Sequence, residues 1–598
     1  MDTIWSKYYR DIPSSEASYT DLTLYEALKK SSKDHPEAVA IQHGRRKFTY
    51  SELMNRTDVL ASALRSFGLG KGDVLALCVN GIPATVFSVY AASKIGAAVS
   101  MFNPKFGPDG FKRICNATGA TVAVMTADLL ASCVSVLGET SVRTVIVARY
   151  SDYFAFHDRI KKSIRNLSAR DSVKYNKMNL PSETRILKLK ELMEEHSGDD
   201  LSFETDISAD SDAIYFGNGG ATGKVMVASL SSRAINAQSS MDSFLLGKER
   251  GRVLSLIDRS FSCGFCLAVH SVLLSGSTLL LYAGDISRFP AEALLIYKPD
   301  VVIAYPGLLM QMIGRLKVMP VNLSFLKKVI SCGAVMNIGQ NYELKSFLKL
   351  HSPNTVIERI YGMDETGAVY IYNPEELKNN RIFGIPLPGI MVKIMDADSE
   401  REMSPGEMGE ICVCTPSAMS CYKDDDGSGE RVIRRFKDGR TWILTGDLGH
   451  ADEKGFIYFD GNSKNIFQRD DVIVYPYVIE ECLMGVDGVK EACVVDVERN
   501  GETYLAAVIV PKDEYLFDAA KLDSLKVALE SECELVFAAP MRPDGFEFRA
   551  YLPKENFGRN DHEALKKQLA EKYRMLDEDD GIDDEIDEEI ENSDDLFN

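Results

Sequence analysis

The first 350 residues alternate between short apolar runs and stretches with helical periodicity. Continuous apolar runs are typical of strands that are buried on both faces of a parallel sheet. They occur at Val74–Val79, Ala120–Met125, Thr144–Ala148 and Val301–Ala304. The spacing of apolar residues at Leu22–Ser32 predicts an amphipathic helix. This alternation predicts layered α/β sheets with parallel strands.

Local signals sharpen some of these boundaries. Thr49 and Glu52 have the spacing of a capping box, so we expect a helix to begin there. Ala38–Ile41 predicts a strand that precedes this helix. Residues 151–200 are polar, which predicts a surface helix and loop.

The pattern changes twice beyond residue 400. Short alternating strands with turns between residues 406 and 459 predict a β-rich region. Farther on, Val489–Val497 and Tyr504–Val510 predict strands, and Leu522–Cys533 predicts a helix. The chain is also too long for a single core.

We therefore predict an α/β protein of three regions. Residues 1–460 form a large N-terminal domain of layered α/β sheets with a β-rich subdomain. Residues 461–575 form a small, mobile α+β C-terminal domain. Residues 576–598 form an acidic disordered tail, because a segment this polar cannot bury enough apolar surface to order itself.

Charge is concentrated at the C-terminus. The formal net charge is −20, but the stretch from Asp577 to Asn598 holds 13 acidic residues and no lysine or arginine. The rest of the chain has 68 basic against 75 acidic residues, which gives no electrostatic reason to expect nucleic-acid binding. The tail has the charge to bind a basic partner, and its spaced isoleucines leave open a helix formed on such a partner.

The N-terminal residues lack a basic region followed by an apolar core, so we expect no signal peptide. We expect no transmembrane segment, since no stretch offers about 20 uninterrupted apolar residues. The 12 cysteines are scattered, and the Cys263-Gly-Phe-Cys266 pair has no second pair at zinc-finger spacing. Buried free thiols in a reducing cytoplasm are the favoured interpretation.

A glycine-rich loop, FGNGGATGKV over Phe216–Val225, follows an apolar run. It has the composition of a phosphate-binding loop, but it fits neither the P-loop nor the dinucleotide-binding template. The alternative is a plain flexible loop between two strands.

Other short motifs follow this loop in a fixed order. They are Ser331-Cys-Gly-Ala334, Tyr361-Gly-Met-Asp-Glu-Thr366, Gly384-Ile-Pro-Leu-Pro-Gly389, Leu444-Thr-Gly-Asp-Leu448, the segment Gly461–Pro476 and Leu552-Pro-Lys-Glu-Asn-Phe-Gly-Arg559. In order and spacing, this series resembles the adenylate-forming superfamily of acyl-CoA synthetases, luciferases and peptide-synthetase adenylation domains. The resemblance extends from about Thr23 to Leu565.

The resemblance implies an ATP-dependent, AMP-forming acid–thiol ligase that requires Mg²⁺ and uses CoA as probable co-substrate. A carboxylate attacks the α-phosphorus of ATP and expels pyrophosphate, and a thiol then displaces AMP from the acyl-adenylate. Because the carboxylate is already ionised at neutral pH, no general base is needed. Catalysis then depends on holding phosphates and compensating their charge.

The resemblance also assigns roles to residues near the phosphates and the adenine. The glycine-rich loop would hold the β- and γ-phosphates through backbone N–H groups, a hydroxyl and a cation, at Gly219, Gly220, Thr222, Gly223 and Lys224. Gly333 and Ala334 would form one wall of the adenine site, and Tyr361 with Gly362 the other.

The remaining roles concern charge. Glu365 matches the carboxylate that binds Mg²⁺, an ion that prefers oxygen ligands. The alternative for Glu365 is a solvated loop acid. Asp447 matches the acid that accepts the ribose hydroxyls, or it is a turn cap. Lys464 matches the hinge of the small domain, or it is a solvated linker residue.

Several positions depart from the family pattern. Arg559 stands where the family has its catalytic lysine, which keeps the charge but replaces a compact ammonium with a planar fork. Met226 replaces a lysine in the phosphate loop, and Asn462 replaces an arginine near the ribose. Asp364 replaces a threonine near the α-phosphate, where a second carboxylate is repulsive unless a metal intervenes. Asp470-Asp471 is acidic where a phosphorylated cofactor would pass.

Three functions therefore remain open. The first is an active acyl-CoA synthetase with a role in fatty acid metabolism. The second is a weakened or inactive homologue that binds nucleotide or partners. The third is an adenylating ligase that acylates a carrier protein instead of CoA.

Overall fold

The structure is a computed structural model, and it describes most of the chain. The described residues are 5–9, 20–79, 81–154, 170–171, 173, 178, 180–219, 225–247, 249–282, 286, 288–377, 379, 381–396, 399–423, 427, 429–470, 472–499, 501–555 and 558–575. The tip of the glycine-rich loop, residues 220–224, and the acidic residues 576–598 lie outside this set, so the predictions for them stay predictions.

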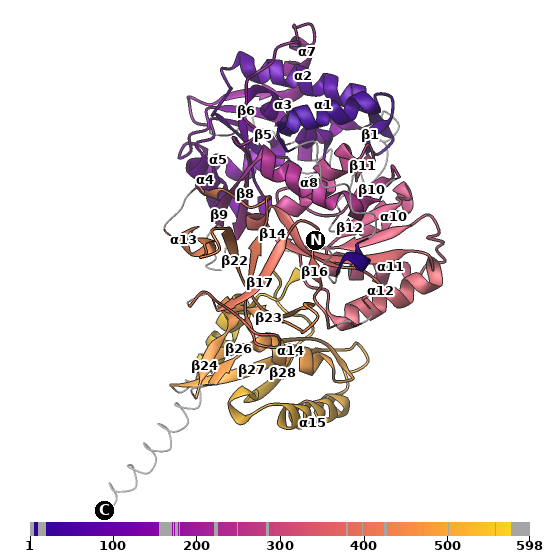
Figure 1. The fold of residues 1–598 in the computed structure, drawn as a ribbon, viewed down its shortest axis with the longest axis vertical. Coiled ribbons are helices and arrows are strands. Elements are labelled where there is room, and N and C mark those ends of the chain that lie inside the picture. The colour runs from indigo at the N-terminus through magenta and orange to yellow at the C-terminus, as the bar shows by residue number, and fades with distance from the viewer. Residues whose placement is uncertain are drawn as a thin grey trace, which may run out of the picture. The chain divides into compact units, whose positions relative to one another are not determined.

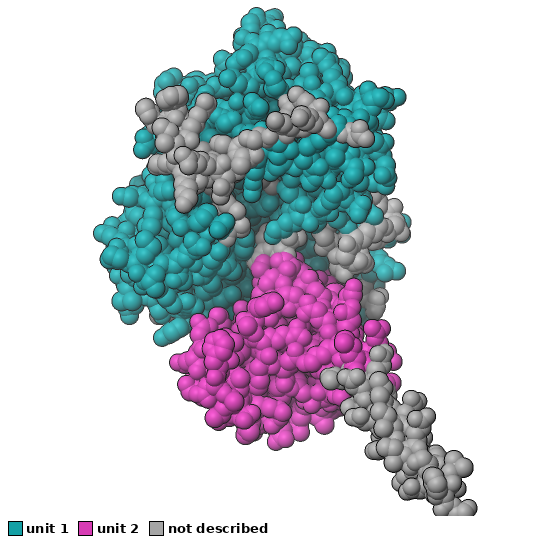
Figure 2. Space-filling view, turned by 180° about the vertical axis from the view of Figure 1, so that it is seen from behind, with its two compact units in different colours: residues 1–405, 411–445, 451–457 teal, residues 406–410, 446–450, 458–598 magenta. Residues whose placement is uncertain are grey.

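The chain divides into two compact units (Figure 2). Unit 1 comprises residues 1–405, 411–445 and 451–457. Unit 2 comprises residues 406–410, 446–450 and 458–598.

A nine-stranded sheet forms one layer of unit 1 (Figure 1). Its order is β16 (Ile385–Pro386), β15 (Ala368–Asn373), β14 (Val356–Met363), β13 (Lys328–Ser331), β12 (Val301–Ala304), β10 (Arg252–Ser255), β11 (Thr278–Leu281), β1 (Val39–His43) and β2 (Arg46–Thr49). The strands from β14 to β1 pair in parallel, and the outer pairs are antiparallel. The predicted parallel α/β pattern is confirmed here.

An eight-stranded sheet forms the second layer. Its order is β20 (Cys421–Tyr422), β9 (Val225–Ser231), β8 (Asp212–Gly219), β4 (Ala98–Met101), β3 (Val74–Cys78), β5 (Val122–Thr126), β6 (Thr144–Ala148) and β7 (Arg185–Lys188). β8 and β9 form an antiparallel hairpin, and β8 continues the sheet in parallel with β4. The edge strand β7 lies in the segment that was expected to form only helix and loop.

Helices cover these sheets. They are α1 (Leu24–Asp34), α2 (Tyr50–Ser66), α3 (Pro83–Ile95), α4 (Gly107–Thr118), α5 (Ala127–Leu137), α7 (Leu189–Glu195), α8 (Ser232–Leu246), α9 (Val272–Leu274), α10 (Pro290–Tyr297), α11 (Pro306–Leu316) and α12 (Ile338–His351). α1, α2 and α3 lie side by side (Figure 1), and α8 contacts strands of both sheets. The predicted capping box is confirmed, because Glu52 N–H donates to Thr49 Oγ1 at 3.1 Å and Thr49 N–H to the Glu52 carboxylate at 2.9 Å.

Two apolar cores sit against these sheets. One packs β10, β12 and β13 against α10, α11 and α12. The other packs β3, β5 and β6 against α4 and α5. A π-helix, η6 (Cys263–Ser271), continues into α9 and contacts α8, β10 and β15. Gly264 is needed in its first turn, since a Cβ there would lie 1.9 Å from the Asp258 carbonyl oxygen.

Short strands build the expected β-rich region. A six-stranded sheet has the order β18 (Arg401–Glu402), β17 (Met391–Asp396), β19 (Gly409–Cys414), β22 (Thr441–Ala451) and β21 (Ile433–Arg435), and β23 (Ile457–Asn462) also pairs with β22. The short helix α13 (Gly429–Val432) leads into β21. Trp442 is fully buried in the small core of this sheet.

Unit 2 has its own cores. The hairpin of β24 (Phe467–Arg469) and β25 (Val472–Val474) precedes α14 (Pro476–Met484). β26 (Val489–Arg499), β27 (Glu502–Pro511) and β28 (Gly545–Phe548) form a three-stranded sheet, with α15 (Ala519–Val536) between β27 and β28. One face of β26 and β27 packs on α14 and α15, and the other on a helix over 562–575. No helix among the described residues is long and apolar enough to cross a membrane.

Candidate active site

Two neighbouring parallel strands of the nine-stranded sheet place the predicted adenine residues at one edge. β13 pairs in parallel with β14 over Lys328–Ser331. Gly333 and Ala334 follow β13, while Tyr361 and Gly362 lie near the end of β14. Ligands of α/β proteins bind beyond the carboxyl ends of strands. These four residues therefore come together where a nucleotide site is expected.

The Tyr361 side chain is held by other aromatic rings. It is buried, and its ring centroid lies 5.0 Å from that of Phe383 and 5.8 Å from that of Tyr370, both edge to face. Such pairs restrict the rotation of a ring as well as burying it. The predicted adenine-stacking ring therefore has one fixed orientation.

Gly362 is required by a close approach of backbone. A Cβ at this position would lie 1.5 Å from the carbonyl oxygen of Ala368 on the neighbouring strand β15. The β14–β15 register also shifts between Tyr361 and Gly362. The packing of β14 against β15 thus explains why glycine occupies this position, whether or not a ligand binds nearby.

Two adjacent carboxyl groups follow this strand on a 3₁₀ turn, η7 (Asp364–Thr366). Both side chains are buried, and each has a donor of its own. The Tyr422 hydroxyl donates to Glu365 Oε1 at 2.6 Å, and the backbone N–H of Ser262 donates to Asp364 Oδ1 at 2.8 Å. The carboxyl oxygens are therefore oriented before any ligand binds.

Burial, followed by the neighbouring charge of Glu365, raises the pKa of Asp364 to about 7. With this pKa, Asp364 is partly protonated at neutral pH, which reduces the repulsion between the two adjacent carboxyl groups. This explains how the chain tolerates aspartate at a position where the resemblance leads us to expect threonine.

Sequence reasoning missed two side chains that support this turn. Tyr422 lies on the short edge strand β20, far along the chain from Glu365. Ser417 Oγ lies 2.8 Å from the Thr366 carbonyl oxygen and 2.9 Å from Gln238 Oε1. Neither residue belongs to a local motif, so only the tertiary fold reveals them.

The glycine-rich loop connects β8 and β9, whose last pair is Gly219 with Val225. Asn218 pairs with Met226 just before it. Gly220, Thr222, Gly223 and Lys224 lie in the tip, outside the described residues. The hairpin fits both a phosphate-binding loop and the plain connecting loop that was the alternative.

In unit 2, the two predicted cations share one carboxylate. Arg559 Nη2 lies 3.4 Å from Glu555 Oε2, and Lys464 Nζ lies 3.3 Å from Glu555 Oε1. The Arg559 side chain is 44% exposed and lies in a short loop where Lys554 bridges to Asn560. Arg559 is thus a projecting cation rather than a buried one, as its predicted role requires.

The predicted ribose acid also has a partner in unit 2. Asp447 is buried, and Asn462 Nδ2 donates to Asp447 Oδ1 at 2.9 Å. The Asn462 side-chain oxygen accepts the N–H of Lys464 at 3.2 Å and begins the turn η8 (Ser463–Asn465). Asn462 therefore caps this turn and orients Asp447. The sequence showed only that asparagine replaces the arginine of the family, and it did not show these two contacts.

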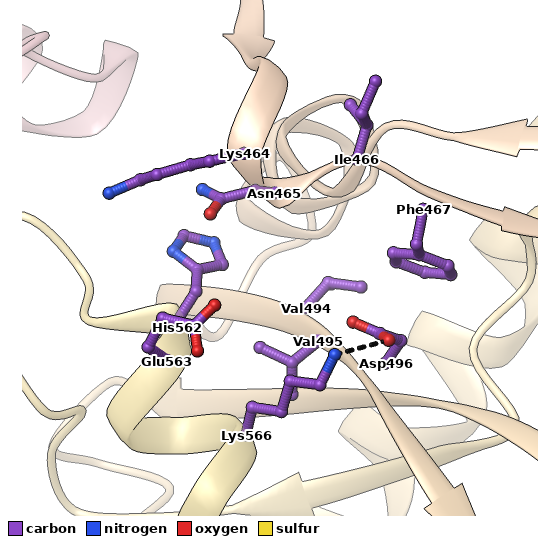
Figure 3. A pocket seen from close by; sticks show the side chains of 10 residues that line it. All are labelled: Lys464, Asn465, Ile466, Phe467, Val494, Val495, Asp496, His562, Glu563 and Lys566. Carbon is purple, nitrogen blue, oxygen red and sulfur yellow. Dashed lines mark hydrogen bonds and ion pairs between the residues drawn. The ribbon is translucent and has the colours of Figure 1, made fainter. Parts of the chain in front are cut away.

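A cavity of about 90 Å³ lies beside the predicted hinge within unit 2 (Figure 3). Lys464, His562, Glu563 and Lys566 line it, and Lys566 Nζ lies 2.6 Å from Asp496 Oδ2. Its lysines have carboxylate partners, since Lys464 pairs with Glu555. The cavity shows no excess of positive charge that would select an anion.

One further cluster contains metal-ligating atom types. Among the described residues, Glu480, Cys493 and His562 bring one ligand atom each within 4.8 Å of one another. His562 Nε2 lies 2.8 Å from Glu480 Oε1, which also accepts the N–H of Val494 at 2.8 Å. Burial acts to lower the pKa of His562, but the Glu480 carboxylate, a backbone hydrogen bond at Asn560 and the charge of Glu555 together make the net shift upward. These hydrogen bonds satisfy the cluster internally, linking α14, β26 and the helix over 562–575.

Comparisons with known proteins agree with this architecture. The AMP-binding enzyme family matches residues 28–423, and the AMP-binding enzyme C-terminal domain matches residues 478–559. The chain is 25% identical to a long-chain-fatty-acid–CoA ligase of Salmonella typhimurium, covering 96% of this chain and 99% of that protein. It is also 25% identical to a ligase of the same name from Bacillus subtilis, with 95% and 97% covered.

Among solved structures, the fold is similar to that of the anthranilate CoA ligase AuaEII in complex with anthranoyl-AMP. The TM-score is 0.76 at 17% identity, over 92% of this chain and 98% of that one. The family match spans well over half of the chain and includes the sheet edge, the buried carboxyl pair and the Arg559 loop. The chain therefore belongs to the AMP-binding enzyme family, within the adenylate-forming superfamily.

Proposed function

We propose that this protein is an ATP-dependent acid–thiol ligase that converts a carboxylic acid to its CoA thioester through an acyl-adenylate. The observation that carries the proposal is the buried carboxyl pair Asp364–Glu365, held by Tyr422 and Ser262 directly beyond the Tyr361-Gly362 strand end. A preoriented carboxylate beside a fixed aromatic ring suits a metal-bound nucleotide.

The two half-reactions balance without an acid–base residue. In the first, an oxygen of the substrate carboxylate forms a bond to the α-phosphorus of ATP, and the bond to the bridging oxygen of pyrophosphate breaks. In the second, the thiol of CoA loses its proton to solvent, its sulfur forms a bond to the acyl carbon, and the bond between that carbon and the phosphate oxygen breaks, so that AMP leaves with the bonding electron pair. Each step needs positioning and charge compensation more than proton transfer.

Glu365 is the residue that would hold Mg²⁺. Its carboxylate is buried and already accepts a hydroxyl hydrogen bond on Oε1, which leaves the orientation of the group fixed. Asp364 adds a second carboxyl group. A divalent cation bound there would displace the proton that the raised pKa of this group favours. When bound, the ion neutralises charge on the phosphate oxygens.

The other roles follow from the chemistry of each side chain. The exposed guanidinium of Arg559 would compensate charge on the α-phosphate and the acyl carboxylate. Asp447, oriented by Asn462, would accept the ribose hydroxyls. Thr222 and the glycines beside it would hold the terminal phosphates. Lys464 would serve as the hinge.

One observation favours a second candidate, a homologue that binds nucleotide with little turnover. Asn462 already donates to Asp447, and Met226 supplies no cation beside the loop. Transfer to a carrier protein instead of CoA is a third outcome. A cytoplasmic location is part of the proposal and is supported by the 12 cysteines, which are thiols rather than disulfides.

The test is ATP–pyrophosphate exchange over a panel of fatty and aromatic acids, followed by thioester formation with CoA or a phosphopantetheinyl carrier protein. Exchange that depends on an acid and on Mg²⁺ supports the ligase. Measurable ATP affinity without exchange for any acid contradicts it and supports the second candidate. If exchange occurs but the acyl group is transferred only to the carrier protein, the carrier protein replaces CoA as the acyl acceptor in the proposal.

A further inference from the structure

Two cysteines that are distant in sequence face each other beside the predicted site. Cys263 Sγ lies 3.2 Å from Cys332 Sγ. Cys332 is buried at the end of β13, directly before Gly333, whereas Cys263 is partly exposed at the start of η6. The sequence showed Cys263 only as part of a CxxC pair of expected free thiols, whereas the fold brings the distant Cys332 against it.

The backbone holds both thiols in place. Cys263 directly precedes Gly264 in the first turn of η6, and before this turn the Ser260 hydroxyl donates to Asp258 Oδ1 at 2.7 Å. Cys332 donates its N–H to the Ala304 carbonyl oxygen at 3.0 Å. Two thiols that meet on fixed elements have little conformational freedom to lose when a bond forms between them.

We propose that Cys263 and Cys332 form an oxidative modification site, in which a peroxide converts the two thiols to a disulfide. The thiolate of Cys263 attacks a peroxide oxygen and gives a sulfenic acid, with the other oxygen leaving as water. The Cys332 thiol then attacks the sulfenic sulfur, forming the disulfide and releasing a second water. Two thiols and one hydrogen peroxide thus yield one disulfide and two waters.

The different environments of the two thiols assign their order in this sequence. Cys263 is the partly exposed thiol and can meet a dissolved peroxide. Burial raises the pKa of Cys332 well above its ordinary value, so this group stays a thiol until the sulfenic acid reaches it. Disulfides in a reducing compartment are typically transient and regulatory.

The position of the pair links oxidation to the predicted chemistry. Ser262, next to Cys263, donates its N–H to Asp364, and Gly333, next to Cys332, belongs to the predicted adenine wall. Closing the sulfur separation to about 2.05 Å would pull η6 and the end of β13 together. A misplacement of about 1 Å can cost about 10²-fold in rate. This consequence for turnover rests on the proposed function, whereas the modification itself does not.

The chemical test treats the full chain with a small excess of hydrogen peroxide, blocks the remaining thiols with N-ethylmaleimide, and maps cross-linked peptides by mass spectrometry. We expect one peptide pair joined through Cys263 and Cys332, lost on treatment with dithiothreitol. Cys263→Ser should abolish it. Cys414→Ser, a partly exposed cysteine on β19, should leave it unchanged. Sulfinic acid at Cys263 without a cross-link, or a Cys263–Cys266 cross-link, would overturn the proposal.

The functional test measures ATP–pyrophosphate exchange on the same samples. Oxidation should lower the rate about 10²-fold, reversibly, in the wild type and in Cys414→Ser but not in Cys263→Ser. Inactivation that persists in Cys263→Ser would refute the link to turnover. A cross-link in a protein that activates no acid even when reduced would uphold the modification and refute the proposed function. An enzyme that is active but forms no cross-link would uphold the proposed function and refute the modification.

Discussion

The charged groups of unit 1 and unit 2 are held in different ways. In unit 1, Glu365 and Asp364 are buried, and each accepts a hydrogen bond from a donor fixed by the fold. In unit 2, Arg559 and Lys464 are 44% and 29% exposed and share the single carboxylate of Glu555. The carboxyl pair of unit 1 is therefore buried and oriented by the fold, whereas these two cations of unit 2 are solvent-exposed and share one partner.

This difference has an energetic meaning. A buried carboxyl with dedicated donors keeps its position because breaking its hydrogen bonds leaves unpaired groups in a low dielectric. Exposed ion pairs contribute only about 0–1 kcal/mol and exchange partners readily. The carboxyl pair is suited to holding a metal-bound nucleotide, whereas the cations can leave Glu555 for a more negative partner.

The largest expected effect comes from a substitution in the buried carboxyl pair of unit 1. Glu365→Gln removes the proposed metal-binding charge, so we expect acid-dependent ATP–pyrophosphate exchange to fall by about 10³-fold. The Mg²⁺ concentration for half-maximal rate should rise as well.

Glu358→Gln is a matched control for this change. Glu358 is also a buried glutamate, on β14, and it accepts a tyrosine hydroxyl from Tyr372 at 3.2 Å. It pairs with Lys328 at 3.0 Å, so its loss should lower stability but leave the Mg²⁺ requirement unchanged. An equal shift in both variants would contradict the metal role of Glu365.

The next largest effect is expected from a substitution of Arg559, an exposed cation of unit 2. Arg559→Ala should lower the adenylation rate about 10²-fold, because it removes the charge proposed to act in the transition state. Arg559→Lys keeps the charge and should retain most of the rate. The measurement is initial-rate AMP release with saturating ATP.

Arg549→Ala provides the control for this substitution. Arg549 is another arginine of unit 2, bound to Glu547 at 2.7 Å, and its removal makes the same change in net charge. It should leave the rate within a few-fold. A loss of rate in Arg549→Ala as large as in Arg559→Ala would show that the effect is structural.

A smaller effect is expected from releasing both cations at once. Glu555→Gln removes the shared acceptor of Lys464 and Arg559. Since these pairs are partly exposed, we expect less than about fivefold change in kcat and no loss of stability above about 1 kcal/mol. Glu547→Gln, which releases Arg549 and Lys572 in the same unit, is the matched control. A collapse of activity confined to Glu555→Gln would mean that Glu555 itself positions Arg559.

The smallest effect concerns a buried acid of unit 1 outside the carboxyl pair. Burial raises the pKa of Asp242 from 3.8 to about 7. The folded state therefore binds more protons than the unfolded state between these values, and stability falls as pH rises from about 4 to about 7. Asp242→Asn removes this ionisation. Between pH of about 4 and about 7, the Tm of this variant should therefore fall by a few °C less than the Tm of the wild type.

Glu249→Gln is the control, because its side chain is 91% exposed. Thermal unfolding followed at several pH values should show no change of slope in this variant. An unaltered slope in Asp242→Asn would contradict the raised pKa.

Much of unit 1 was predictable because its strands are buried on both faces. Thr144–Ala148 and Val301–Ala304 form strands with the predicted bounds, since continuous apolar runs carry a strong local signal. The edge strand β7 was missed because its residues are only partly buried and its sequence is polar. An edge position is decided by a neighbouring strand, which no local pattern reveals.

The candidate site shows the same division. Tyr361, Glu365 and Arg559 lie in motifs whose order along the chain could be read directly. Tyr422 lies in no motif. Glu555 and Cys332 lie inside motifs, but the motifs assign them no role, and their contacts with Lys464 and Cys263 appear only in the tertiary structure. Asn462 was read as a lost cation, whereas its amide makes a hydrogen bond that only the tertiary structure shows.

The contact between Gly362 and the Ala368 carbonyl oxygen limits how this protein can be redesigned. A library aimed at a different nucleobase has no freedom at position 362, where even a methyl group would force β14 and β15 apart. Variation around Tyr361 has to enter through the two rings that pack against it, those of Phe383 and Tyr370.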